Sequence, residues 1–170
     1  MDNNILTDFM ELTAALEYDF MDILNQLFTK IIIPTPILED ELLNNDLGSL
    51  EYEEGIFESE LGYRAFMDIS TSNTRMAKQL SEYDRYVIAI AIEYSLLAVS
   101  NDKPLREVCR KYGVEVTGTI GIIVAAYENQ LLSFQQMQEA YIYLFSDQSS
   151  CYLSNKLKKM FYDYYSIEEV

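Results

Sequence analysis

Apolar residues along this chain form two kinds of segment, which are short unbroken runs and longer stretches with helical spacing. A short apolar run bounded by polar residues, glycine or proline is typical of a buried strand. Such runs predict strands at residues 4–7, 30–36, 96–100 and 114–118. Stretches in which apolar residues recur with the period of a helix predict helices at residues 9–28, 37–45, 80–96, 104–112, 119–130 and 133–145.

Several of these helices carry signals at their ends. Ser81 with Asp84, and Ser133 with Gln136, have the spacing of a capping box, in which each side chain binds the other residue's backbone N–H group. Gly113 follows the helix at 104–112, at the position where a left-handed residue commonly ends a helix. A hydroxyl N-cap is expected for the helix that starts at Thr119. The helix at 80–96 is apolar around most of its surface, so we expect it to be buried on more than one side.

Residues 46–74 are the part of the chain in which the pattern favours no single structure. Polar and apolar residues alternate there between glycines, which is compatible with a helix–turn unit or with a loose hairpin. The run at residues 65–70, AFMDIS, is also compatible with a strand.

Strands and helices that alternate along a chain predict an α/β fold, with a mostly parallel sheet and right-handed crossovers. Sites in such sheets form at the carboxyl ends of the strands. Acidic residues stand at these ends. Asp8 follows the first predicted strand, and Asp102 follows the strand at 96–100. Glu41 lies on the helix after the second strand, and Asp84 lies in the first turn of the helix that precedes the strand at 96–100.

Charge and composition exclude several classes of function. The 170 residues include 12 basic and 28 acidic residues and no histidine, for a net charge of −16. Without histidine, His-based triads, His-ligated zinc and imidazole acid–base catalysis are excluded. The mean electrostatic field repels polyanions and argues against a simple nucleic-acid-binding module. It suits a basic protein partner, or a site where cations bridge carboxylates to phosphate.

We expect a cytoplasmic protein of one domain, with no membrane association. Two cysteines, Cys109 and Cys151, form no CxxC pattern, which indicates a reducing compartment. The first residues, MDNNILTD, lack the basic region of a signal peptide. The longest apolar runs are too short to span a bilayer.

The order of the four acids, with the segments around them, resembles the PIN-domain family and in particular the VapC-like ribonucleases of toxin–antitoxin pairs. Three blocks carry the resemblance. They are ILTD at residues 5–8, IIIPTPILEDEL at residues 31–42, and residues 80–132, where a helical Asp, an apolar strand and a polar corner with Asp102 lead into a valine strand and Gly-Thr-Ile-Gly. The resemblance implies a PIN-like α/β/α sandwich. We assign residues 1–150 to this domain and residues 151–170 to a helical, tyrosine-rich extension packed on it.

The resemblance also implies a site and an activity. Asp8, Glu41, Asp84 and Asp102 would form the catalytic acidic cluster, and Asp8, Asp84 and Asp102 would ligate Mg²⁺ or Mn²⁺, ions that prefer oxygen ligands. The implied activity is a metal-dependent endoribonuclease that hydrolyses RNA phosphodiester bonds. Members of this kind are toxins restrained by a basic antitoxin protein, and they are usually homodimers.

Alternatives remain open at this point. Phe9 stands directly after Asp8, where the family usually has a small hydroxyl residue or Asn, so a catalytically inactive PIN-like module that binds protein is the second hypothesis. Glu39 or Asp40 could take the place of Glu41, since the three acids are adjacent. Taken alone, each acid also fits a cap, a turn or a solvated surface position.

Overall fold

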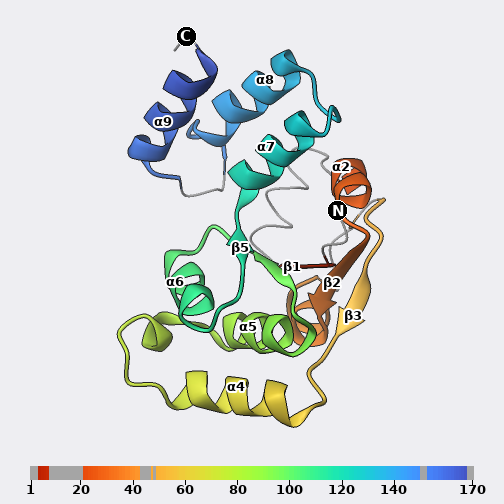
Figure 1. The fold of residues 1–170 in the computed structure, drawn as a ribbon, viewed down its shortest axis with the longest axis vertical. Coiled ribbons are helices and arrows are strands. Elements are labelled where there is room, and N and C mark those ends of the chain that lie inside the picture. The colour runs from red at the N-terminus through yellow and green to blue at the C-terminus, as the bar shows by residue number, and fades with distance from the viewer. Residues whose placement is uncertain (1–3, 8–20, 43–46, 48, 150–152, 168–170) are drawn as a thin grey trace.

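A sheet of five parallel strands forms the centre of the computed structural model, which describes residues 4–7, 21–42, 47, 49–149 and 153–167 (Figure 1). The strands pair in the order β3-β2-β1-β4-β5, and every pairing is parallel. Their bounds are β1 (Asn4–Thr7), β2 (Lys30–Pro34), β3 (Glu53–Gly55), β4 (Leu97–Val99) and β5 (Val116–Thr117). The predicted α/β class with a parallel sheet is therefore confirmed, and each of the four predicted strands that lie at β1, β2, β4 and β5 is present.

The strand order places a topological switch point in the middle of the sheet. From β1 the chain proceeds to β2 and β3 on one side, whereas β4 and β5 lie on the other side. In the register of β1 with β4, Thr7 is the partner of Val99, so both strands end at the same level. The crevice outside the carboxyl ends of strands at such a point is the general ligand position of open α/β sheets.

Helices lie on both sides of the strands. In Figure 1, α4 and α5 lie below the strands, and α7, α8 and α9 lie above them. The helical segments are α2 (Met21–Leu27), α3 (Thr35–Ile37), the π-helical turn η1 (Leu38–Leu42), α4 (Glu60–Thr71), the 3₁₀ turn η2 (Ala77–Gln79), α5 (Glu82–Tyr94), α6 (Lys103–Lys111), α7 (Thr119–Glu128), α8 (Phe134–Leu144) and α9 (Asn155–Tyr165). None of the helices in the described ranges combines the length and the apolar character needed to traverse a lipid bilayer.

The helix α5 is the central element of the core, as its apolar sequence predicted. It contacts β1, β2 and β4 on one side and α4 on another. Its five consecutive residues from Val87 to Ala91 are at most 1% exposed. Such complete burial needs a helix with apolar residues all round, because both neighbouring layers must be satisfied. The predicted capping box of Ser81 and Asp84 is present at its start.

Of the alternatives that the sequence left open, a strand at residues 65–70 is wrong, because these residues belong to α4. The N-cap of this helix is Ser59, whose hydroxyl accepts a hydrogen bond from the Gly62 N–H, and the helix buries Gly62, Ala65 and Ile69 at helical spacing. Large apolar residues on its outer side, such as Tyr63 and Met67, are more than half exposed and obscure this period in the sequence. The hidden period explains why the sequence pattern favoured no single structure there.

The prediction that a hydroxyl residue caps the helix at Thr119 is also wrong. The N-cap residue of α7 is Gly118, which has no side chain that could accept a hydrogen bond from the helix. Asn101, at the end of β4, takes that role across the fold. Its Oδ1 accepts the Thr119 N–H at 3.1 Å, and its Nδ2 donates to Thr119 Oγ1 at 3.0 Å. A Cβ on Gly118 would collide with the Asn101 side chain, so this close approach requires glycine. At the end of α6, Gly113 has φ +73°, as its position predicted.

Other predicted helices are confirmed over the parts of them that can be followed. Of the helix predicted at residues 9–28, α2 is described and residues 9–20 are not. The helix predicted at 37–45 begins earlier, at Thr35, and continues as η1. The tail forms α9, and its rings pack on the neighbouring helices. Phe161 lies 5.3 Å from the Tyr141 ring of α8, and Tyr165 lies 6.0 Å from the Tyr127 ring of α7.

Candidate active site

Asp84 is held at the first turn of α5 by the residue that begins the helix. Its Oδ2 atom accepts hydrogen bonds from the Ser81 backbone N–H at 2.7 Å and from the Ser81 hydroxyl at 2.8 Å. In return, the Ser81 hydroxyl accepts the Asp84 N–H at 3.1 Å. The capping box therefore fixes one carboxylate oxygen, while Asp84 Oδ1 has no hydrogen-bond partner within the described part of the chain.

Asp102 is held in a similar way at the first turn of α6. Its Oδ2 atom accepts the Leu105 N–H at 2.9 Å, and its own N–H donates to the hydroxyl of the buried Ser100 at 3.1 Å. The side chain is exposed, and among the described residues no partner contacts Oδ1. Asp102 thus follows β4 closely, at the carboxyl edge of the sheet and beside the end of β1.

The two carboxylates influence each other electrostatically. Burial raises the pKa of Asp84 above its ordinary value, and the negative charge of Asp102 adds to this increase. The hydrogen bonds from Ser81 act in the opposite direction without cancelling the effect. Repulsion of this kind is relieved when a cation lies near both groups. The fold therefore brings Asp84 and Asp102, which are 18 positions apart in the sequence, close enough for their charges to interact, although Arg85 offsets part of the effect on Asp84.

The acidic run after β2 approaches the same end of α5. Asp40, on η1, accepts a hydrogen bond from the Tyr83 hydroxyl at 3.0 Å, and Tyr83 directly precedes Asp84. Asp40 is the alternative that the sequence left open beside Glu41. The backbone of Glu41 lies in η1, but its side chain is not part of the described structure. Asp8 likewise lies outside the described residues, one position after the end of β1.

The carboxylate oxygens of Asp84 and Asp102 are of the type that a hard cation such as Mg²⁺ prefers. Within those residues, no group of three or more acidic, cysteine or histidine side chains converges as a metal site. Asp84 and Asp102 each offer a second carboxylate oxygen, and Mg²⁺ typically takes one or two protein carboxylates and keeps several waters. The chemistry of these two residues therefore suits a divalent cation of the Mg²⁺ or Mn²⁺ type, since in each of them the capping bonds use only one carboxylate oxygen.

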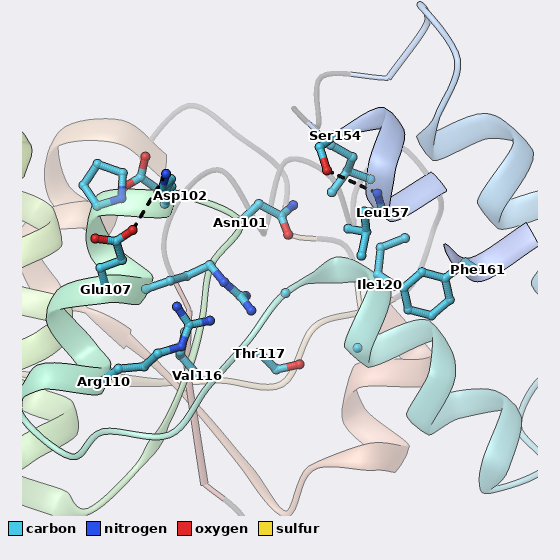
Figure 2. Close-up of a pocket in the computed structure, with 16 residues that line it drawn as sticks. Asn101, Asp102, Glu107, Arg110, Val116, Thr117, Ile120, Ser154, Leu157 and Phe161 are labelled. Carbon is cyan, nitrogen blue, oxygen red and sulfur yellow. Dashed lines mark hydrogen bonds and ion pairs between the residues drawn. The ribbon is translucent and has the colours of Figure 1, made fainter. Parts of the chain in front are cut away.

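A cleft of about 690 Å³ opens beside Asp102, between α6 on one side and α7 and α9 on the other (Figure 2). Its lining residues are Asn101, Asp102, Lys103, Pro104, Arg106, Glu107, Arg110, Val116, Thr117, Gly118, Ile120, Gly121, Leu153, Ser154, Leu157 and Phe161. The two arginines are not among the candidate site residues that the sequence pattern indicated. Their i, i+4 spacing, four and eight residues after Asp102, is the signal that would have placed them on one helix face beside it.

Comparison with known families agrees with this architecture. A parallel sheet with a switch point and two carboxylates beside its carboxyl edge defines the class of this protein as α/β. A family model described as PIN domain matches residues 10–163. The chain therefore belongs to the PIN-domain family, as its resemblance implied. No curated protein sequence matches it significantly.

Membership in the PIN-domain family indicates a general class of function. PIN domains are typically nucleases and generally use divalent metal ions. The matched range includes Glu41, Asp84 and Asp102, and it begins two residues after Asp8. It also continues through most of α9, so the division of the chain at residue 150 stays a prediction.

Proposed function

We propose that this protein is an endoribonuclease that depends on Mg²⁺ or Mn²⁺ and hydrolyses RNA phosphodiester bonds. Asp84 and Asp102 hold the cation, together with Asp8, and Glu41 completes the acidic cluster, with Asp40 as its alternative. The observation that carries the proposal is the pair of capping carboxylates. Each of them uses one oxygen at a helix start and leaves the other without a partner among the described residues.

Placing two carboxylates near each other costs free energy. Two like charges near each other, one of them partly buried, destabilise the folded protein unless protons or a cation neutralise them. Burial and Asp102 both act against ionisation of Asp84, as the raised pKa shows. Helix capping needs a single acceptor at each position, which a serine or asparagine would also supply. Cation binding gives a use for the charge at both positions, which capping alone does not need.

A divalent ion held by Asp84 and Asp102 would supply positive charge for the phosphate and would favour the attack of water on phosphorus. The residues of this chain orient the site. Ser81 fixes the Asp84 carboxylate through two hydrogen bonds, and Ser100 and Leu105 fix Asp102. The cleft beside Asp102 gives an RNA strand room to approach the carboxylates.

We further propose that the enzyme is the toxin of a toxin–antitoxin pair, restrained by a basic antitoxin protein, and that it acts as a homodimer. The net charge of −16 supports the basic partner, because complementary charge accelerates and orients association. A small basic reading frame beside this gene, whose product co-purifies with the chain, would test this part separately.

The test of the activity compares paired variants. In the variant that combines Asp84→Asn with Asp102→Asn, each side chain keeps a capping oxygen but loses its charge, so we expect the fold to persist and Mn²⁺-dependent cleavage of single-stranded RNA to fall to background. The control is Asp68→Asn, which removes an exposed carboxylate on α4. Cleavage at the wild-type rate in the double variant would refute the proposal. A preparation made in the same way without this protein must show no cleavage, which excludes RNase contamination.

The second candidate is a catalytically inactive PIN-like module that binds protein. It is favoured by the capping roles of Asp84 and Asp102, which account for both residues without a metal. Calorimetric titration with Mn²⁺ separates the two functions. Heat of binding that disappears in the double variant supports the nuclease, whereas absence of heat and of any thermal stabilisation supports the inactive module.

A further inference from the structure

The cleft beside Asp102 has two chemically different walls. Figure 2 shows Glu107 and Arg110 on the side of α6, and Ile120, Leu157 and Phe161 on the opposite side, with Asn101 and Thr117 between the walls. Asp102 lies at the rim, so the cleft is continuous with the candidate active site.

The wall on α6 is basic. Lys103, Arg106 and Arg110 are three of the 12 basic residues in the whole chain, and all three line this cleft. Arg106 donates from Nη1 to the Ser100 carbonyl at 2.8 Å, which fixes its guanidinium near the end of β4. Glu107 lies 3.8 Å from Lys103 as an i, i+4 pair. Arg110 has no ion-pair or hydrogen-bond partner anywhere in the described ranges, so its charge is available to a ligand.

The opposite wall is apolar and contains an aromatic ring in a fixed position. Phe161 is half-buried, so part of the ring stays accessible. It packs behind on Tyr141 at 5.3 Å and stacks with Tyr165 at 6.3 Å and an interplanar angle of 13°. The ring is therefore held by neighbours on α8 and α9. Leu157 and Ile120 extend the apolar surface beside it.

Guanidinium groups opposite an aromatic ring are the combination that binds single-stranded nucleic acid, through phosphate contacts on one side and base stacking on the other. The positive wall is unusual in a chain with a net charge of −16, because the electrostatic field of the whole protein repels anions. A basic peptide would be repelled by Arg106 and Arg110, so a basic antitoxin is a poor occupant of this cleft.

We propose that this cleft binds a nucleotide of single-stranded RNA adjacent to the scissile phosphate, with Arg110 on a backbone phosphate and Phe161 stacked on the base. The inference rests on the proposed nuclease function and assigns a substrate-binding role to residues outside the acidic cluster. Phe161 selects for a stacked base and Arg110 positions the strand.

The test is fluorescence anisotropy with a labelled single-stranded RNA of about 12 nucleotides, in the presence of Mn²⁺. The full chain is used with Asp84→Asn, which is not in the cleft lining, to prevent cleavage. Arg110→Gln is expected to weaken binding by about fivefold and to reduce the slope of log affinity against log salt by about 0.7, the value for one phosphate contact on a single strand. Phe161→Leu is expected to weaken binding by about fivefold or more, and Phe161→Tyr to restore it.

Matched controls lie away from the cleft. Arg64→Gln removes an exposed arginine on α4, and Phe134→Leu removes an exposed ring at the start of α8. Both are expected to leave the affinity and the salt slope unchanged. Thermal unfolding of each variant checks the fold, and Arg110 is exposed, so its replacement tests the cleft even where Phe161→Leu weakens the packing of α9.

Three results would overturn the assignment. Equal affinities and salt slopes for the cleft variants and the controls, in a chain whose unmodified form cleaves RNA, would remove the cleft and leave the nuclease. Binding of a glutamate–tyrosine copolymer that is lost in the cleft variants, while RNA affinity is unchanged, would make the occupant an acidic peptide. No RNA binding together with no RNA cleavage by the unmodified chain would remove the cleft assignment and the nuclease together.

Discussion

The contact between Glu93 and the start of α4 gives a quantitative prediction about stability. The Glu93 carboxylate, near the end of α5, accepts the backbone N–H of Glu58 at 3.0 Å and that of Ser59 at 3.2 Å. These N–H groups are at the N-terminal end of α4, where a helix leaves donors without intrahelical partners. Gly62 permits the approach, because a Cβ there would overlap the Glu93 carboxylate and Phe57. One side chain thus joins the outer helix to the central one.

Glu93→Ala removes both hydrogen bonds and the favourable charge at the start of the helix. Charge-assisted bonds and the helix dipole would together contribute about 2–4 kcal/mol in a buried site, and solvent exposure of the pair reduces this to about 1–2 kcal/mol. A chain of this size loses about 2–4 °C in Tm per kcal/mol. We therefore expect Tm to fall by about 2–8 °C at pH 7, as measured by circular dichroism.

The pH dependence of this difference has a defined sign. Burial alone would raise the pKa of Glu93, but the hydrogen bonds from Glu58 and Ser59 outweigh it and hold the pKa below the ordinary value of 4.5. A carboxyl with a lowered pKa in the folded state stabilises the protein above pH 4.5, and this contribution is lost as the pH falls below that value. The gap between wild type and Glu93→Ala should therefore narrow in acid.

The exposed Glu51, whose side chain makes no such contact with the described residues, provides the control substitution Glu51→Ala. Equal Tm values for wild type and Glu93→Ala at pH 7, or a gap that stays constant down to pH 3, would refute the reasoning about this contact.

Two further substitutions test other parts of the fold. Tyr141 is fully buried, its hydroxyl has no hydrogen-bond partner in the described structure, and burial followed by the charges of Tyr165 and Glu128 raises its pKa. Tyr141→Phe removes an unpaired polar group, so we expect unchanged or higher stability, by up to about 1 kcal/mol in urea unfolding, and a loss above that amount would show a hidden partner. Gly113→Ala places a side chain at φ +73°, and we expect a loss of about 1–2 kcal/mol in the same assay; no loss would mean that the end of α6 rearranges freely.

The sequence by itself determined the elements whose signals are local. Ser81 and Asp84 are three positions apart, so the capping box at the start of α5 depends only on the chain near it. The apolar residues of α5 and the short runs of β1, β2 and β4 likewise carry their period or length within one segment. The parallel sheet followed from their alternation.

Only the tertiary structure decided the contacts between distant segments. Asn101 caps α7 from 18 positions away, and Asp40 reaches Tyr83 from 43 positions away. The period of α4 was masked because several of its outward residues are apolar, and burial against α5 distinguishes the two sides. Arg110 and Phe161 lie on opposite walls of one cleft because of the way in which α6 and α9 pack. Sequence spacing fixes which neighbours lie within a few residues, whereas the approach of separate elements depends on the packing of the whole core.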